Sequence, residues 1–340
     1  MCKDSSATPD IKTKRASLPY RALACLVTIC LCGCPLGTPR DHSRPSGHRG
    51  TTIAVSPADD EIVFNAMGKG GRDLYLFNLT TKKARRIAST PDYETAPSFS
   101  PDGQSIVYSS GVSGDRADHI FTIRRDGTAI TQLTYEDAND TSPRFSPDGS
   151  TITFARDKTY QWGGLAANWE QGGVICLIDA TGNNLRQLTS DDIFAFEPFF
   201  SNDGLHIVFS TPNGRMTIPV DGSSAPQAIP GPSGAVPSPD GKFIAYSKGK
   251  FEPDLRICIT DPNEAAEREL TPNIGGCYHP VFTHAGDRIL FQRSEWPNGL
   301  TGGNVKFSVW QIDLDTGVTQ ILADRSLIDS PLTWKPQPKP

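Results

Sequence analysis

Short apolar runs alternate with polar turns along most of this chain. The runs are rich in β-branched and aromatic residues, as at 105–108, 151–154, 206–209, 243–246 and 288–291. Each follows a turn of the type Ser-Pro-Asp-Gly or a variant of it. Proline presets φ at the first central position, Asp bonds its own backbone, and Gly takes the positive-φ position. The pattern therefore predicts consecutive β-hairpins whose second strand is buried.

The turn occurs six times. The copies lie at residues 55–59, 99–103, 145–149, 200–204, 237–241 and 282–286. Their spacing of roughly 37 to 55 residues is the period of propeller blades. A third strand follows in each unit and ends at a second turn, as at 125–127, 180–182 and 220–222. A fourth strand ends on Leu-Thr, as at 133–134, 188–189 and 270–271. The sequence therefore predicts an all-β, six-bladed β-propeller with four-stranded antiparallel blades.

The two ends of the repeat region suggest how the ring closes. Residues 329–336 restart the first strand of the repeat and then stop, while residues 51–55 begin within that same strand. We expect the N- and C-terminal strands to pair in one blade, because this closes the ring and removes exposed sheet edges.

The motif set resembles the WD-repeat-like propeller of TolB. It consists of a Pro-x-Phe-Ser-Pro-Asp-Gly strand pair, an Asp-Gly turn and a terminal Leu-Thr, and it covers roughly residues 51–337. TolB carries an α/β domain before its propeller, whereas only about 50 residues precede the first blade here. The resemblance therefore concerns the propeller alone. It implies a protein or peptide partner in the cell envelope.

The N-terminal region predicts secretion. Basic residues precede an apolar run at 22–31, which is too short for a stop-transfer helix and has the proportions of a signal peptide. The run ends in Leu-Cys-Gly-Cys, which resembles a lipoprotein box with Cys34 as the lipidated residue. We expect a lipoprotein signal peptide at 1–33, a flexible tether at 34–50 and the propeller at 51–337. The alternatives are an ordinary cleaved signal or a membrane anchor.

This reading places the chain on an envelope membrane, facing the periplasm or the cell exterior. Because Cys34 is followed by Pro35 and not by aspartate, the resemblance to lipoprotein sorting signals indicates an outer membrane if the source has one.

Composition and cysteine placement limit the classes of partner and the covalent links to be expected. The net charge is −5, which argues against nucleic acid. Cys176 and Cys258 fall in one repeat slot that other blades fill with large apolar residues, so we expect buried free thiols. A Cys258–Cys277 bridge between neighbouring blades is the alternative.

Two long loops depart from the repeat. In an up-down blade, the loops between second and third strands share one face with the links between blades. The loops at 157–173 and 294–304 should lie on that face, in opposite blades, and flank the mouth of the central channel. They carry four aromatic residues that we expect to bind a ligand: Tyr160, Trp162, Trp169 and Trp296. Alternatively, these side chains fold back and cap their own blades.

The same face should present the residues at the start of each first strand. Four carboxylates and a histidine would then surround the mouth: Glu94, Asp140, Glu197, His279 and Asp329. They could hold Ca²⁺ through oxygen ligands or attract a basic peptide. We favour a solvated acidic rim, and we therefore expect no metal and no cofactor.

No enzyme motif stands out. The sequence has no Gly-x-Ser-x-Gly elbow, no His-Glu-x-x-His and no paired-cysteine zinc spacing. We therefore expect no catalytic residue and a monomeric binding module that recognises an envelope protein or peptide on the loop face. The alternative is a carbohydrate-binding or polysaccharide-cleaving propeller, in which His279 would act with Arg144 or Asp140.

Overall fold

The computed structural model describes residues 53–67, 72–90, 93–111, 117–158, 173–249, 254–263, 266–271, 276–295 and 306–323. Every regular element among them is a β-strand, and the strands form six four-stranded sheets. In each sheet the strands pair in sequence order and antiparallel, as the repeat predicts. The described residues include no helix of the length and hydrophobicity needed to cross a membrane.

The first three blades follow one another without crossovers. Blade one contains β1 (Ile53–Val55), β2 (Glu61–Met67), β3 (Arg72–Asn78) and β4 (Lys83–Ala88). Blade two contains β5 (Glu94–Phe99), β6 (Ser105–Gly111), β7 (Asp118–Arg124) and β8 (Thr131–Gln132). Blade three contains β9 (Asn139–Phe145), β10 (Thr151–Asp157), β11 (Val174–Asp179) and β12 (Arg186–Gln187).

The last three blades repeat the pattern. Blade four contains β13 (Phe196–Phe200), β14 (His206–Thr211), β15 (Gly214–Pro219) and β16 (Gln227–Ile229). Blade five contains β17 (Val236–Pro237), β18 (Ile244–Lys248), β19 (Arg256–Thr260) and β20 (Arg268–Glu269). Blade six contains β21 (Cys277–Phe282), β22 (Arg288–Glu295), β23 (Lys306–Asp313) and β24 (Thr319–Ala323).

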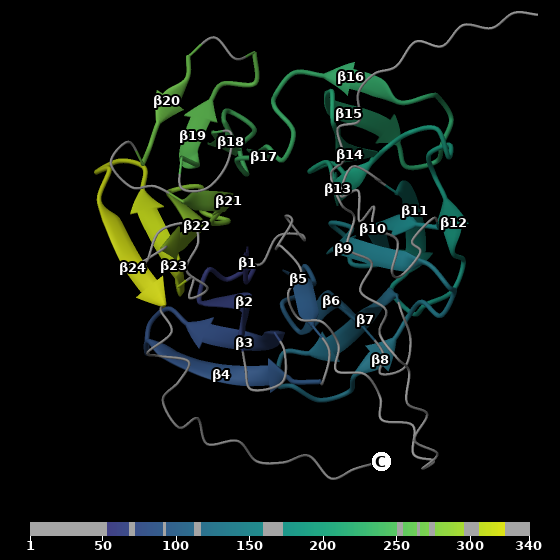
Figure 1. Cartoon of the computed structure of the whole chain (residues 1–340), viewed down its shortest axis with the longest axis horizontal. Coiled ribbons are helices and arrows are strands. Elements are labelled where there is room, and N and C mark those ends of the chain that lie inside the picture. Colours follow the sequence, from purple (N-terminus) through teal and green to yellow (C-terminus); the bar gives the residue numbers. More distant parts are fainter. Residues whose placement is uncertain are drawn as a thin grey trace, which may run out of the picture. The chain divides into compact units, whose positions relative to one another are not determined.

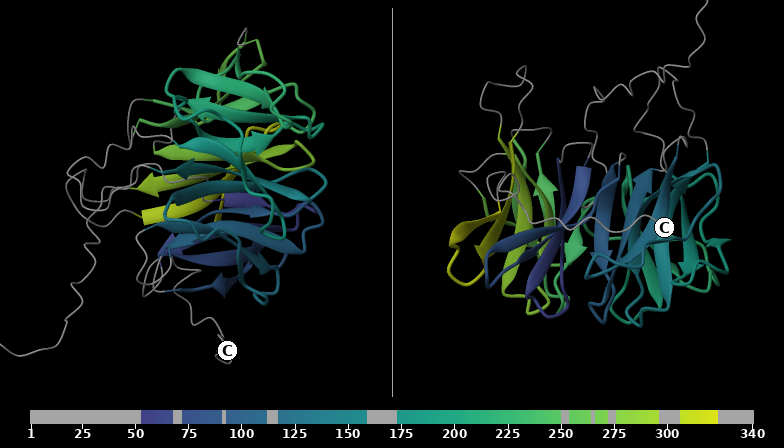
Figure 2. Two further views of the ribbon diagram at one scale, coloured as in Figure 1. Left: turned by 90° about the vertical axis from the view of Figure 1, so that its right-hand side faces the viewer. Right: turned by 90° about the horizontal axis from the view of Figure 1, so that it is seen from below.

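The six sheets are arranged around one axis (Figure 1). The first strand of each blade lies nearest the axis and the fourth lies at the periphery (Figure 1). Viewed from two further sides, the sheets stand side by side with their faces opposed (Figure 2). Strand β1 lies against β21 and β22, so the first and last blades are neighbours. This arrangement confirms the all-β, six-bladed propeller.

The predicted pairing of the chain ends is not decided. Strand β1 pairs with β2 and completes a four-stranded blade made entirely of residues 53–88. The proposed C-terminal partner, residues 329–336, lies outside the described residues. Closure by that strand therefore stays a prediction, as do the boundaries of the signal peptide and the tether.

The core lies between the blades. Apolar side chains on the facing sheets of neighbouring blades form clusters, such as Leu74 and Leu76 of blade one with Ile106 and Tyr108 of blade two. Comparable clusters join blades two and three, three and four, five and six, and six and one. Burial of these faces stabilises the fold by about 25 cal/mol per Å² of apolar surface. The cluster described at blades four and five contains blade-five residues only: Ala235, Ile244, Tyr246 and Cys258.

A second contact recurs at the blade boundaries. The turn glycine of one blade lies against the turn proline of the preceding blade: a Cβ on Gly103 would lie 3.4 Å from Cδ of Pro57. The same contact joins Gly149 to Pro101, Gly204 to Pro147 and Gly286 to Pro239.

Two boundaries break this rule. Asn202 replaces the proline of blade four, and its side-chain amide donates to the Pro239 carbonyl over 3.1 Å. Between blades six and one, Asp59 replaces the glycine and His284 replaces the proline. Asp59 accepts bonds of 2.9 Å from the backbone N–H groups of both His284 and Ala285. A backbone N–H is available at residue 284 only because it is not proline.

The described cysteines agree with the prediction of free thiols. Cys176, Cys258 and Cys277 are buried and unbridged, so the alternative Cys258–Cys277 disulfide is wrong. Burial raises the pKa of the Cys176 thiol to about 12 and that of Cys258 and Cys277 to about 11. The thiolate, which is the reactive form, is therefore disfavoured.

Candidate functional site

The antiparallel order gives the propeller two different faces. The turns between first and second strands and between third and fourth strands lie at one end of the blades, which we call the turn face. The loops between second and third strands and the links from one blade to the next lie at the other end, which we call the loop face.

On the turn face, the same serine–aspartate hydrogen bond recurs within the turns. In four blades the turn serine donates to the aspartate two residues later: Ser100 to Asp102, Ser146 to Asp148, Ser201 to Asp203 and Ser238 to Asp240. The serine hydroxyl holds the pKa of each of these aspartates below its usual value. These carboxylates serve the turns themselves.

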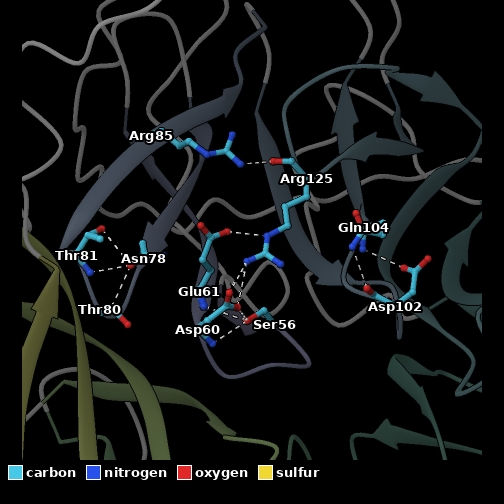
Figure 3. A network of polar contacts seen from close by, with 10 residues as sticks. All are labelled: Ser56, Asp60, Glu61, Asn78, Thr80, Thr81, Arg85, Asp102, Gln104 and Arg125. Atoms are coloured by element: carbon cyan, nitrogen blue, oxygen red, sulfur yellow. Dashed lines mark hydrogen bonds and ion pairs between the residues drawn. The ribbon is translucent and has the colours of Figure 1, made fainter.

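Ion pairs on the turn face also join blades. Arg125 of blade two pairs with Asp60 and Glu61 of blade one, each over 2.9 Å (Figure 3). Arg85 of blade one donates in turn to the Arg125 carbonyl (Figure 3). Arg186 of blade three makes the corresponding bond to the carbonyl of Val220 in blade four. Three arginines of this face, Arg85, Arg125 and Arg186, therefore link neighbouring blades.

Glu94 lies at the loop-face end of β5, where the sequence predicts it, but it is buried and not solvated. One carboxylate oxygen accepts a 2.9 Å bond from the backbone N–H of Thr90. The other, Oε2, has no hydrogen-bond partner among the described residues. Burial raises the pKa of Glu94 to about 7, the Thr90 bond opposes this rise, and the nearby Asp73 carboxylate adds to it.

Asp140 is also buried, because Arg156 of the neighbouring strand β10 covers it. The two residues pair across β9 and β10, and the guanidinium donates to both carboxylate oxygens over 2.7 and 2.8 Å. Arg156 also donates to the exposed Glu136 and lies 5.4 Å from the centre of the Phe154 ring. Burial raises the pKa of Asp140, and the bonds from Arg156 offset part of that rise.

Glu197 and His279 occupy a different position in the repeat. Each lies in a β-bulge of the first strand and has a positive φ, 50° and 53° respectively. Other blades place Ala96, Ser142 and Gly234 at the same position, also with positive φ. The backbone conformation is therefore a property of the repeat and does not by itself indicate a functional role.

The predicted acidic rim is therefore wrong for two of its members. The sequence aligned Glu94 and Asp140 with Glu197 and His279, but the bulge separates them into two classes. The first pair is buried beneath the link between blades, and the second pair is half-buried in the bulge. Tyr278 packs edge-on against the His279 ring, with 5.1 Å between ring centres.

Arg144 lies two residues beyond its bulge, on the inner strand β9. The equivalent positions of the other blades, identified by register, hold Ala54, Ser98, Phe199, Val236 and Val281. Arg144 is half-buried and donates to the Pro143 carbonyl over 3.0 Å. Enclosure by protein lowers its pKa to about 10, and the Glu197 carboxylate opposes this shift.

Two links of the loop face carry exposed polar residues that sequence reasoning did not select. Tyr135 is 72% exposed, and it is followed by the exposed Glu136 and Asp137. Asp191 and Asp192 are exposed at the corresponding place between blades three and four. Their signal in the sequence is an acidic pair one residue after the Leu-Thr that ends blades two and three.

The remaining predicted site residues lie outside the described part of the chain. These are Tyr160, Trp162, Trp169, Trp296, Asp329 and the lipidation residue Cys34. Within the described residues, no group of three or more His, Cys, Asp or Glu side chains is arranged to hold a metal ion.

Comparison with known proteins agrees with this architecture. The family model described as the TolB beta propeller domain matches residues 47–162. A TolB structure from Agrobacterium tumefaciens superposes with a TM-score of 0.56 at 20% identity, covering 73% of this chain and 87% of that one. TolB from Acinetobacter baumannii gives 0.56 at 17% identity, covering 78% of this chain and 61% of that one.

A third similar structure is an enzyme. Oligogalacturonate lyase from Vibrio parahaemolyticus superposes with a TM-score of 0.53 at 15% identity, covering 82% of this chain and 79% of that one. At such identities the superposition shows the fold alone. The six four-stranded blades show that this chain is a six-bladed β-propeller, and the repeat motifs and the family model matched over residues 47–162 show that it is similar to the propeller of TolB.

Proposed function

We propose that this propeller is a binding module of the cell envelope, anchored through Cys34, which recognises a protein or peptide partner on its loop face. The supporting observation is a set of exposed aromatic and acidic side chains on the loop face. Several charged side chains of the turn face link blades or fix turns. The loop face presents an exposed tyrosine next to exposed carboxylates, namely Tyr135, Glu136, Asp137, Asp191 and Asp192.

The exposed tyrosine suits such a surface. An aromatic ring contributes a large contact area with few rotatable bonds, and its hydroxyl fixes its orientation. Here the Tyr135 hydroxyl donates to the Gln132 carbonyl over 2.8 Å, so the ring is held in place while most of it stays exposed. The aromatic loop residues of the prediction, Trp162 and Trp296, would extend this surface.

Site-specific photo-crosslinking in the intact envelope tests the proposal. A photoreactive amino acid replaces Tyr135 on the loop face or, as the matched control, Leu205 on the turn face, which is 64% exposed. We expect one crosslinked protein from position 135 and none from position 205. Loss of this product in Trp162→Ala/Trp296→Ala, at an unchanged melting temperature, would extend the binding surface to the long loops. Crosslinking from 205 alone would place the partner on the turn face and contradict the proposal.

The likeness to oligogalacturonate lyase supports an alternative, a propeller that binds or cleaves an acidic polysaccharide. His279 would then act with Arg144 or Asp140. Its test is the release of unsaturated oligosaccharides from polygalacturonate, followed by ultraviolet absorbance. Product formed by the wild type and abolished in His279→Ala would favour this alternative. The burial of Asp140 under Arg156 argues against a catalytic role for that carboxylate.

A further inference from the structure

The third strand of blade four breaks the repeat with a charged residue. Arg215 precedes Met216 at the start of β15, and its cross-strand partner is Ser210. The other five blades fill this position with a buried aliphatic residue. These are Leu74, Ile120, Ile175, Ile257 and Val309, each 3% exposed or less. Arg215 is itself only 7% exposed, so a guanidinium occupies a place built for an aliphatic side chain.

No negative charge compensates this buried cation among the described residues. Burial is the sole cause of its lowered pKa, and no carboxylate pairs with it. One bond is made, from Nη1 to the Pro230 carbonyl over 3.2 Å, while Nε has no partner. A buried charge without a counter-charge is strongly unfavourable unless a partner supplies one.

The packing between blades four and five also differs from that at the other boundaries. At the other boundaries, the aliphatic residue of this position joins an apolar cluster with the next blade. At blades four and five, the described cluster contains no blade-four residue. The link at residues 230–234 lies over Arg215, so closely that a Cβ on Gly231 would stand 2.8 Å from Nη1. The boundary is therefore polar where the others are apolar.

One hydroxyl group lies next to Arg215. Residues paired across antiparallel strands have Cβ atoms about 5 Å apart on the same side of the sheet, which places Ser210 beside Arg215. Ser210 Oγ accepts the backbone N–H of Gly234 over 2.9 Å. Its hydroxyl proton has no acceptor among the described residues, so it can donate. A guanidinium and a hydroxyl together match the acceptors of an oxyanion.

We propose that Arg215 anchors a binding site for an oxyanion, a carboxylate or a phosphate, at the boundary between blades four and five. The ligand would approach from the loop face, where Gly231, Pro232 and Ser233 are half-buried. Because Nε is buried beneath the link at residues 230–234, the ligand would displace this link, neutralise the guanidinium and accept bonds from Arg215 Nε and Ser210 Oγ. This site is independent of the protein-binding proposal above.

Thermal unfolding of the full chain tests the site, with sodium phosphate or sodium galacturonate compared with sodium chloride at equal ionic strength. The wild type should melt roughly 5 °C higher at a phosphate or galacturonate concentration about 100-fold above Kd. Arg215→Leu, which restores the aliphatic residue of the repeat, should lose this shift. Arg256→Leu in blade five is the control and should keep it, because Arg256 has Glu269 as a partner at 3.8 Å.

The two anions distinguish the kind of ligand, because a site for carboxylates should raise the melting temperature with galacturonate and a site for phosphates should raise it with phosphate. Equal shifts in the wild type and in Arg215→Leu would indicate general stabilisation by an excluded salt and would overturn the proposal. An absence of any shift in the wild type would overturn it too. Should Arg215→Leu fail to fold, calorimetric titration of Arg215→Gln with the same anions replaces it, and retained binding would contradict the proposal.

Discussion

Glu94 shows how one buried side chain couples the fold to pH. Its carboxylate lies between the link after blade one and the strands of blades one and two. The Asp73 carboxylate helps to raise its pKa, and Glu94 in turn helps to raise the pKa of Tyr108. Asn65 donates to its backbone carbonyl over 3.1 Å, and Arg86 pairs with Asp73 over 2.9 Å. Because Oε2 has no partner, the ionised form is poorly compensated and the protonated form is favoured.

This environment predicts a stability that falls as pH rises. The pKa of Glu94 is about 7 in the folded protein against 4.5 for an exposed glutamate. Between these values the folded state binds more protons than the unfolded state, so the free energy of unfolding decreases from pH 4.5 to pH 7, by roughly 3 kcal/mol. Glu94→Gln should remove this dependence and be more stable than the wild type above pH 7.

Urea unfolding at several pH values measures this effect. The exposed Asp137→Asn is the control and should follow the wild-type curve. Parallel pH curves for the wild type and Glu94→Gln would show that Glu94 ionises normally in the folded protein.

At the scale of the element, the blade depends on glycines in left-handed conformations at defined points. Gly241 in the turn before β18 has φ of 72°, and Gly276 before β21 has φ of 71°. Their surroundings differ. Nothing lies within 4 Å of a Cβ on Gly241, whereas a Cβ on Gly276 would meet the Ser294 carbonyl oxygen at 2.5 Å.

Alanine substitutions at these two glycines therefore distinguish the cost of backbone strain alone from the cost of strain plus steric overlap. Gly241→Ala should lower the free energy of unfolding by about 1 kcal/mol, the cost of a side chain in the left-handed region. Gly276→Ala adds an overlap with backbone and should lower it by more than twice as much. Chemical denaturation of both variants checks the difference. Equal losses would mean that the backbone at Gly276 relaxes without cost.

At the scale of the whole molecule, the ring must close between blades six and one, and the sequence changes there on both sides at once. Asp59 takes the left-handed glycine position with φ of 53°. Its carboxylate binds the two N–H groups of residues 284 and 285 from the last blade. Four of the remaining boundaries use the contact between proline and glycine. The bonds of Asp59 therefore join the last blade directly to the first.

A double-mutant cycle tests this closure. Asp59→Gly removes the acceptor, and His284→Pro removes one donor, so each should destabilise the propeller by about 2 kcal/mol. The double variant recreates the proline–glycine contact of the other boundaries. Its decrease in the free energy of unfolding should therefore be smaller than the sum of the two single decreases. Urea unfolding gives the three values. Strict additivity would contradict a direct link between the two residues.

Much of this architecture could be predicted from the sequence because it depends on local chemistry. The Ser-Pro-Asp-Gly turns and the β-branched runs each fix a hairpin, and six copies at a blade-like spacing fix the propeller. The site was less predictable. The β-bulge before Pro97, Pro143, Pro198 and Pro280 shifts the register, so residues that look equivalent in an alignment, such as Asp140 and Glu197, differ in burial.

The sequence by itself determined the elements, the number of blades and the division into two faces, because turn chemistry and strand periodicity act over a few neighbouring residues. Only the tertiary structure decided which charges are paired or buried. Glu94, Asp140 and Arg215 all look like surface residues in the sequence, yet each lies beneath a neighbouring strand or link. Burial and charge compensation depend on contacts between segments that the repeat brings together in space, and these contacts set the chemistry of the loop face.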